Sequence, residues 1–222
     1  MLPAQPNKSL INGLACLQAV VTADRPLGSR EVARLLCLEH TRVNRLLGTL
    51  CHLGMLERTA ARKYAPGPGI HVLSAQSLRG SGLLAAALPH LRELVDENLM
   101  IAMGVLWEQS ICYLVHAGPG QDPDTTIGGH DLYPANRSVI GIALLAEMSD
   151  AKVRKVFAAA DPKLSQGEMK ELMADLARAR KRGYAVKDVR DSHTSVSVVV
   201  GNPGVCAIAV SNIKKKSDVP CL

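Results

Sequence analysis

The segment Ser29–Tyr64, SREVARLLCLEHTRVNRLLGTLCHLGMLERTAARKY, decides the fold of the first part of the chain. Ser29 is a residue type that caps helices, and we expect it to begin a short helix. After a turn at Cys37–His40, a further helix is expected over Thr41–His52, with Gly54 as its C-terminal signal. A short hairpin with a polar turn at Thr59–Lys63 then completes the segment.

One more helix is expected before this segment. Apolar residues recur at helical spacing between Ile11 and Val21, up to a stop at Asp24–Pro26. The order is therefore helix, helix, turn, helix and basic hairpin, which is the order of a winged helix-turn-helix. We predict such a domain over residues 1–66.

The third helix of this domain has two different faces. Val43, Leu47 and Leu50 fall on one face, which must pack on the two preceding helices. The rest of its surface carries residue types that suit a DNA major groove: Thr41, Arg42, Asn44, Arg45, Gly48 and Thr49. Arginine can pair with guanine and asparagine with adenine, and a helix N-terminus favours phosphate. These six residues, with Arg62 and Lys63 at the hairpin tip, are the candidate DNA-binding set, and an ordinary solvated face is the alternative.

The charge of the chain is unevenly distributed. Residues 1–66 hold nine basic and four acidic residues, a net charge of +5, whereas the remaining residues contribute only +1 of the total of +6. This asymmetry indicates that the first segment meets a polyanion and the second does not. A basic surface without a partner is the alternative.

The remainder of the chain is expected to hold a connecting helix and an α+β domain. Pro66–Gly69 breaks the first pattern, and a helix over Ile70–Leu88, interrupted at Gly80–Gly82, connects the domains. We place this linker at residues 67–88 and the second domain at residues 89–222, with a new helix from Pro89 to Asn98. Helices are expected over Ser138–Glu147, Ala151–Ala160 and Ser165–Arg182, and strands over Ile101–Trp107, Ile111–His116, Tyr184–Lys187, Ser195–Val200 and Val205–Ser211. Hairpins with intervening helices make this an antiparallel sheet with flanking helices.

Composition excludes several classes of protein. Apolar residues make up 47% of the 222 residues, which is typical of a globular chain, and no apolar run approaches the ~18 residues of a membrane span. We find no secretory signal, and the six cysteines show no CxxC pair, so we expect a cytoplasmic protein without a membrane partner. The low aromatic content of 3% argues against stacking on single-stranded nucleic acid. Nucleophile, zinc-protease and P-loop motifs are missing, so no catalytic residue, metal or cofactor is expected.

The ordered motifs resemble the IclR-type bacterial transcriptional regulators. In the first half the matching stretches are Glu31–Ala33, Val43–Leu47, Leu53–Arg58 and Tyr64 with Gly67–Pro68, and in the second half Pro134, Ser138, Gly141, Ala143–Ala146, Arg182–Val186 and Ala207–Ser211. This resemblance implies a winged-helix DNA reader, a linker helix, and a ligand-sensing domain with a GAF-like or profilin-like sheet. It further implies a homodimer or homotetramer, and we expect a roughly palindromic double-stranded operator.

The resemblance also implies an effector site in the second domain. Carried over position by position, it suggests Leu132, Ala135, Asn136, Ser138, Asp188, Ser197 and Ser211 as effector-binding residues. The chain departs from the family where it has Asn136–Ser138 in place of His-Ala-Thr or His-Ala-Ser, and Lys187–Arg190 in place of acidic residues. A small carboxylate or an aromatic metabolite suits an apolar cavity with a few hydrogen-bonding groups.

Two other functions stay open from the sequence. The chain could be a non-catalytic protein-interaction or ligand-sensing module that has lost DNA binding. Less favoured is a hydrolase-like enzyme that uses the α+β half, because such an enzyme needs an acid/base pair that the sequence does not display.

Overall fold

The computed structural model describes residues 5–128, 132–158, 163–189 and 193–214. The chain divides into two compact units, Met1–Leu83 and Leu84–Leu222, and each is described by itself. In the part that is described, no helix is both long and apolar enough to cross a membrane.

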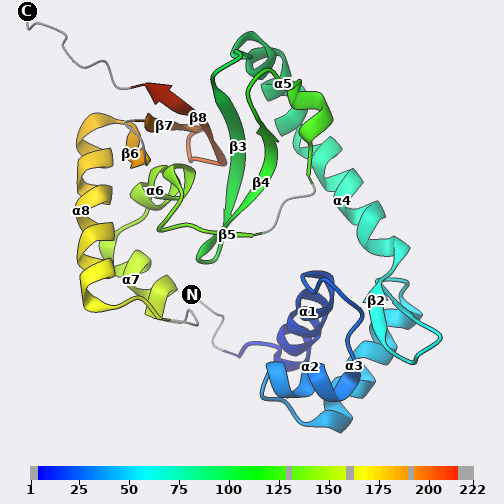
Figure 1. Ribbon diagram of the computed structural model, residues 1–222. Coiled ribbons are helices and arrows are strands. Elements are labelled where there is room, and N and C mark those ends of the chain that lie inside the picture. The colour runs from blue at the N-terminus through cyan, green and yellow to red at the C-terminus, as the bar shows by residue number, and fades with distance from the viewer. Residues whose placement is uncertain (1–4, 129–131, 159–162, 190–192, 215–222) are drawn as a thin grey trace, which may run out of the picture. The chain divides into compact units, whose positions relative to one another are not determined.

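The first unit is the predicted winged helix-turn-helix (Figure 1). Its elements are α1 (Lys8–Val21), α2 (Ser29–Leu35), α3 (His40–His52), the strands β1 (Leu56–Arg58) and β2 (Tyr64–Pro66), and α4 (Pro68–Ser81). The two strands pair antiparallel, with Arg58 opposite Tyr64. The core forms where α1, α2 and α3 meet, around Cys16, Val32, Val43 and Leu47, all of them fully buried.

The start of α2 differs from the prediction. Gly28, not Ser29, is the N-cap, and the Glu31 carboxylate accepts a hydrogen bond from the Gly28 N–H at 3.1 Å. Ser29 is the first residue of the helix, and its Oγ lies 3.0 Å from Nε2 of His40 at the start of α3. The hydroxyl thus joins the two helices of the motif instead of capping its own.

The connecting helix is divided at one residue. α4 ends at Ser81, and Gly82 adopts the left-handed conformation with φ of +65°. The next helix, α5 (Leu83–Glu93), contains Pro89 in its interior, so the prediction that a helix begins at Pro89 was wrong. Proline removes the hydrogen bond to the carbonyl four residues earlier, and here that carbonyl belongs to Ala85, which is exposed, so water can replace the bond.

The second unit is built on a six-stranded antiparallel sheet (Figure 1). The strand order is β5-β4-β3-β8-β7-β6, so the strands nearest the C-terminus insert beside β3. The bounds are β3 (Met100–Trp107), β4 (Ser110–Ala117), β5 (Tyr133–Pro134), β6 (Ala185–Val189), β7 (His193–Val200) and β8 (Cys206–Lys214). The predicted hairpins are present, and β5 is a short edge strand that the sequence did not reveal.

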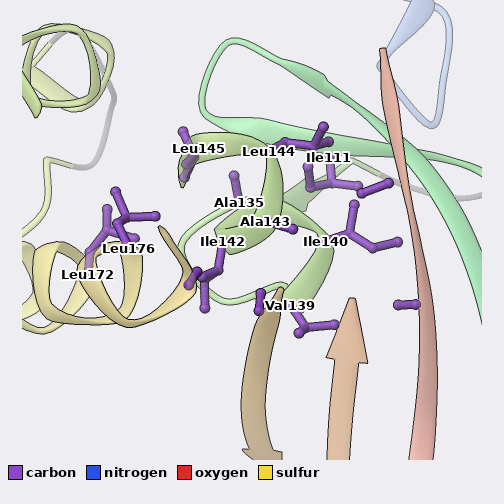
Figure 2. Packing of buried hydrophobic residues seen from close by; sticks show 14 of the residues in the cluster. Ile111, Ala135, Val139, Ile140, Ile142, Ala143, Leu144, Leu145, Leu172 and Leu176 are labelled. Atoms are coloured by element: carbon purple, nitrogen blue, oxygen red, sulfur yellow. The ribbon is translucent and has the colours of Figure 1, made fainter. Parts of the chain in front are cut away.

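Three helices accompany this sheet: α6 (Val139–Ala146), α7 (Asp150–Ala158) and α8 (Gln166–Arg182). Every residue of α6 from Val139 to Leu145 is buried. Figure 2 shows Ile140 on the side of α6 toward Ile111 of β4, and Ile142 on the side toward Leu172 and Leu176 of α8. α6 is therefore the centre of the core, packed between the sheet and α8.

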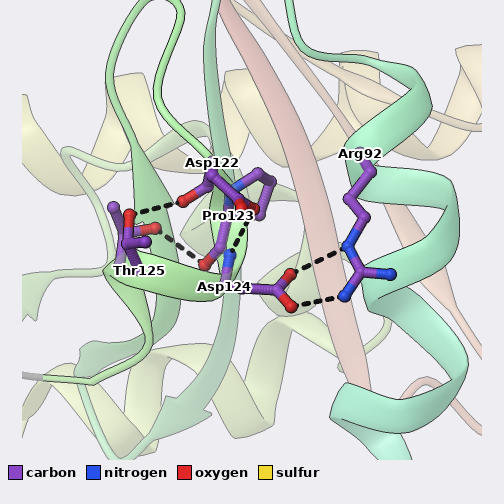
Figure 3. Close-up of polar contacts among 6 residues, drawn as sticks. Arg92, Asp122, Pro123, Asp124 and Thr125 are labelled. Atoms are coloured by element: carbon purple, nitrogen blue, oxygen red, sulfur yellow. Dashed lines mark hydrogen bonds and ion pairs between the residues drawn. The ribbon is translucent and has the colours of Figure 1, made fainter.

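A short loop is fastened to the end of α5. The 3₁₀ helix η1 (Pro123–Thr126) is capped by Asp122, whose side chain accepts from the Asp124 N–H at 3.0 Å. Arg92 of α5 holds Asp124 with two hydrogen bonds, one of them from Nε to Oδ1 at 3.0 Å (Figure 3). The Gly120 N–H donates to the Asp96 carbonyl at 2.9 Å, which is a second connection between the loop and the end of this helix.

We predict that Gly141→Ala strongly destabilises the second unit. A Cβ at this position would overlap the backbone of Ala135, which cannot move without displacing the start of α6. Overpacking of this kind costs about 1–3 kcal/mol of unfolding free energy or more. The measurement is urea unfolding of the full chain followed by circular dichroism.

The matched control is Gly80→Ala in α4. A Cβ there meets no atom within 4 Å, so the substitution should stabilise the helix by about 0.5–1 kcal/mol. Equal unfolding curves for the two alanine variants would contradict the role given to Gly141.

Candidate functional site

The candidate nucleic-acid interface is the exposed surface of α3. Val43 and Leu47 are fully buried against α1 and α2, as the phasing predicted. The residues singled out for DNA all lie on the exposed side of the helix: Thr41, Arg42, Asn44, Arg45, Gly48 and Thr49. The Thr49 hydroxyl donates a hydrogen bond to the Arg45 carbonyl, one turn earlier in the helix, at 3.0 Å.

The first turn of α3 is closed by a carboxylate. Glu39 accepts from the Thr41 N–H at 2.8 Å and from the Arg42 N–H at 2.9 Å. Hydrogen bonds from the Thr41 side chain and from these two N–H groups lower the pKa of Glu39, so it stays ionised. The expectation that this helix end favours phosphate is therefore corrected, because Glu39 already occupies that position.

The hairpin is coupled to α3 through Tyr64. This side chain is buried, its hydroxyl donates to Oδ1 of Asn44 at 3.4 Å, and the Arg58 guanidinium lies 5.8 Å from its ring centre. The contact orients the Asn44 amide and leaves its N–H₂ group available as a donor. Sequence reasoning assigned Tyr64 only to a strand, and nothing in its local pattern indicates a partner 20 residues earlier.

The hairpin tip presents two cations. Arg62 has a positive φ of 57° and closes a turn by donating from its N–H to the Thr59 carbonyl at 2.9 Å. The Lys63 N–H donates to Oγ1 of Thr59 at 3.2 Å. The backbone of the tip is thus held in place, while the side chains of Arg62 and Lys63 are exposed.

Most of the candidate effector residues gather on the face of the sheet that α6 covers. Ser138 is the N-cap of α6, but its hydroxyl lies 3.1 Å from the Tyr113 hydroxyl and makes no capping bond. Ser197 of β7 is buried and donates to the Ile208 carbonyl at 2.9 Å. Ala135 is fully buried beside α6, whereas Leu132 is 40% exposed.

Asp188 does not join this group. Directly paired residues of neighbouring strands point to the same face, and the pairs Ala185–Ser197 and Lys187–Ser195 set the α6-facing side of β6 and β7. Asp188 pairs with Thr194 on the opposite face and accepts a hydrogen bond from its hydroxyl at 3.2 Å. Lys187 is the residue of this stretch that faces α6, and its Nζ donates to the Asn136 carbonyl at 3.1 Å.

Asn136 and Lys187 also line a small cleft beside α8. Its volume is about 120 Å³, and its other lining residues are Arg137, Glu168, Glu171, Leu172 and Asp175. Lys187, Ser195 and Tyr113 are residues near the start of α6 that sequence reasoning missed. The replacement of the family's acidic residues by Lys187 was the one signal that pointed to this place. In the ranges that the structure describes, no cluster of His, Cys, Asp or Glu side chains could hold a metal ion.

Family models match both parts of the chain. Residues 9–60 match the IclR helix-turn-helix domain, and residues 75–214 match the C-terminal domain of the bacterial transcriptional regulator IclR. The chain belongs to the IclR family of bacterial transcriptional regulators. It accordingly combines a helix-turn-helix DNA-binding domain with a C-terminal effector-binding domain.

Two characterised members of the IclR family are similar over most of this chain. The Pca regulon regulatory protein of Pseudomonas putida is 26% identical over 215 residues, which are 92% of this chain and 73% of that protein. The transcriptional repressor IclR of Escherichia coli K12 is 28% identical over 191 residues, 82% of this chain and 69% of that one.

Solved structures of the IclR family share the fold. A regulator from Brucella abortus superposes with a TM-score of 0.76 at 23% identity, covering 95% of this chain and 85% of that one. An IclR homologue from Microbacterium hydrocarbonoxydans, crystallised with 4-hydroxybenzoate, has a TM-score of 0.60 at 20% identity and covers 96% and 91%.

We predict an acid-sensitive contribution of Glu31 to stability. The Arg25 side chain, which donates to Glu31, and the Gly28 N–H lower the pKa of Glu31 from 4.5 to about 2. A lowered pKa stabilises the fold above pH 4.5, and this contribution is lost as the pH falls from 4.5 toward 2. Thermal unfolding by circular dichroism should show a smaller loss over this range in Glu31→Gln than in the natural chain.

Glu57→Gln is the control, since Glu57 is exposed on β1 and forms no ion pair with any residue that the structure describes. Its acid dependence should follow the natural chain. If Glu31→Gln does so as well, the contribution assigned to the Arg25–Glu31 contact is refuted.

Proposed function

We propose that this IclR-family regulator binds a roughly palindromic double-stranded operator as a homodimer or homotetramer, and that a small carboxylate or aromatic metabolite changes its affinity for DNA. The observation that carries the DNA part is the exposed polar side of α3, held in a unit whose first 66 residues have a net charge of +5. Polar side chains on a recognition helix read base edges, and the positive charge attracts the phosphates.

Separate roles follow for the residues of the first unit. Arg45 and Asn44 are proposed to read bases, because their side chains can make the paired hydrogen bonds that guanine and adenine accept. Arg42, Thr41 and Thr49 border them, and Gly48 lets the DNA backbone approach closely. Arg62 and Lys63 are proposed to hold phosphates from the hairpin tip.

Self-association is proposed from the apolar surface of α1 and α4. Leu10, Ile11 and Leu14 of α1 are 60%, 41% and 56% exposed, although each is a core-type residue. Val72 and Leu73 of α4 are also more than half exposed, and α4 has no buried residue. A second copy that covers these residues would also double the number of DNA contacts.

The effector is proposed to bind near the start of α6. The candidates carried from the sequence are Leu132, Ala135, Asn136, Ser138, Ser197 and Ser211; the seventh, Asp188, faces the opposite side of the sheet and is left out of the proposal. Because a relative was crystallised with 4-hydroxybenzoate, an aromatic carboxylate is the first class to test. An effector regulates only if it binds the DNA-competent and incompetent states with different affinity, typically by about 1–3 kcal/mol.

The link between effector and DNA is proposed to run through α5. Arg92 connects α5 to the loop that leads toward Leu132, and Gly82 separates α5 from α4 along the chain. A change in this loop can therefore be passed to α5, which follows α4 directly in the chain. We further propose that the protein acts in the cytoplasm and performs no catalysis, as expected for a regulator of this family.

We predict that Arg45→Ala weakens binding to a selected operator by about 1–3 kcal/mol and relaxes its base preference. The operator is obtained by selection from random DNA followed by sequencing, and affinity is then measured by fluorescence anisotropy at physiological salt. An unchanged dissociation constant would show that Arg45 reads no base.

Two kinds of control distinguish base recognition by Arg45 from a general effect of losing a positive charge. Arg154→Ala, an exposed arginine of α7, removes the same charge from the other unit and should leave DNA affinity unchanged. Arg62→Ala and Lys63→Ala should weaken all sequences alike and lower the salt slope by about one per lost phosphate contact.

We predict that the protein is at least a dimer at micromolar concentration and that Leu14→Glu shifts it toward the monomer. A buried charge at an apolar contact is costly, so the contact should open. Light scattering with and without DNA measures the mass. Leu35→Glu, at the end of α2 and 64% exposed, is the control and should keep the mass of the natural chain. A natural chain that is monomeric under both conditions would refute the proposed assembly.

A further inference from the structure

Asn44 differs from the other residues of α3 proposed to bind DNA, because its side chain is held by another element. Its Oδ1 accepts a hydrogen bond from the Tyr64 hydroxyl of β2 at 3.4 Å. The Arg45 side chain, by contrast, has no hydrogen-bond or ion-pair partner among the residues that the structure describes, and the Thr49 hydroxyl bonds within α3. The Asn44 amide is therefore positioned before any DNA arrives.

The Tyr64 ring is itself fixed from several directions. The Tyr64 N–H donates to the Leu27 carbonyl at 2.8 Å, and the Leu27 N–H donates to the Tyr64 carbonyl at 3.0 Å. Only 4% of Tyr64 is exposed, and Arg58, its partner across the hairpin, places its guanidinium 5.8 Å from the ring centre. A side chain buried in this way cannot change rotamer without disturbing its close-packed neighbours. The hydroxyl thus has a fixed place, and the exposed Asn44 amide has to meet it there.

The hydrogen bond also sets which end of the amide faces the hairpin. A tyrosine hydroxyl has one hydrogen to donate, and here it goes to Oδ1 of Asn44. Oxygen and nitrogen occupy different arms of a planar amide, so the amino group of Asn44 points away from Tyr64. A free asparagine side chain can turn its amide over and offer either its acceptor or its donors. Asn44 is exposed, and the group that it offers to a ligand is the amino group.

We propose that Tyr64 is a specificity-determining positioning residue of the DNA interface, which acts through Asn44 to select a base with an acceptor on its major-groove edge. This rests on the proposed function, because it assumes that Asn44 reads a base. The amino group can donate to N7 of a purine, to O6 of guanine or to O4 of thymine. Cytosine presents its own N4 amino group in the major groove, so two donors would face each other and cytosine is rejected.

The Tyr64 hydroxyl has a second effect, on the order of the Asn44 side chain. A side chain that is already held loses less conformational entropy when it binds. Removing the hydroxyl should therefore weaken binding to the natural operator by about two- to tenfold, in addition to the change in base preference.

The experiment compares base preferences of the full chain and its variants. Operators are selected from random DNA with the natural chain and with Asn44→Ala, and the position at which Asn44→Ala loses its base preference is the Asn44 position. Affinity for the natural operator, with and without cytosine at this position, is measured by fluorescence anisotropy. The natural chain should bind the cytosine operator about five- to a hundredfold more weakly, as expected for one base contact. In Tyr64→Phe this discrimination should largely disappear, because the freed amide can turn and accept from cytosine.

A cycle of single and double substitutions separates positioning from a merely structural role. Phenylalanine keeps the ring in the core and removes only the hydroxyl. If the hydroxyl acts through Asn44, Tyr64→Phe reduces operator affinity in the natural chain but adds no loss in Asn44→Ala. A loss caused by poorer folding would appear equally in both backgrounds. Tyr184→Phe, at an exposed tyrosine of the second unit, is the matched control and should keep the affinity and base preference of the natural chain.

Four results would overturn the role assigned to Tyr64. These are no base position that depends on Asn44, cytosine accepted at that position by the natural chain, full discrimination against cytosine in Tyr64→Phe, and an equal loss from Tyr64→Phe in both backgrounds. In each of them the natural chain still binds its selected operator, so the proposed function stands. A natural chain that binds no selected DNA would refute the proposed function, and this inference with it.

Discussion

The close packing of α6 against the Ala135 backbone at Gly141 is the constraint on which the second unit depends. Only a residue without a Cβ fits there, and the contact holds the segment before α6 against the helix. That segment carries Asn136 and Ser138, which meet Lys187 of β6 and Tyr113 of β4. One backbone approach therefore sets both the centre of the core and the polar groups beside it.

In the first unit, the two sides of α3 have different roles. One side of the helix is buried through Val43 and Leu47, which leaves the other side free for polar residues without loss of core. The buried Tyr64 ring then joins this helix to the hairpin through Asn44. A recognition helix whose side chains are held from a second element loses less conformational entropy when it binds. The rigidity of the hairpin thus bears on DNA reading, in addition to the two cations at its tip.

The two units show different relations between burial and function. In the first unit the residues proposed to bind DNA are exposed, and the buried core residues of α3 lie on its other side. In the second unit the polar groups lie at the margin of the core, where an unpaired hydroxyl is costly unless solvent or a ligand reaches it. The Ser197 hydroxyl is satisfied within the protein, because it donates a hydrogen bond to the Ile208 carbonyl. The Ser195 hydroxyl has no such partner among the described residues.

Much of the architecture followed from the sequence by itself. The order of helices and hairpin, the buried side of α3 and the later β-hairpins are local patterns, set by residue periodicity, turns and caps within a few residues. The cap of α2 was misjudged by one residue, because Gly28 is the N-cap where Ser29 is the more familiar capping residue. The break at Gly80–Gly82 was predicted correctly, but the helix that follows it continues through Pro89, where a new helix had been expected to begin.

The contacts between segments that are distant in the sequence were decided only by the tertiary structure. Alternation along a strand sends neighbours to opposite faces, so the choice between Lys187 and Asp188 depended on the register of β6 against β7, which no local pattern encodes. The Tyr64–Asn44 and Arg92–Asp124 contacts likewise join residues 20 and 32 positions apart. Their existence depends on the path of the chain through space, and hence on packing of the whole unit.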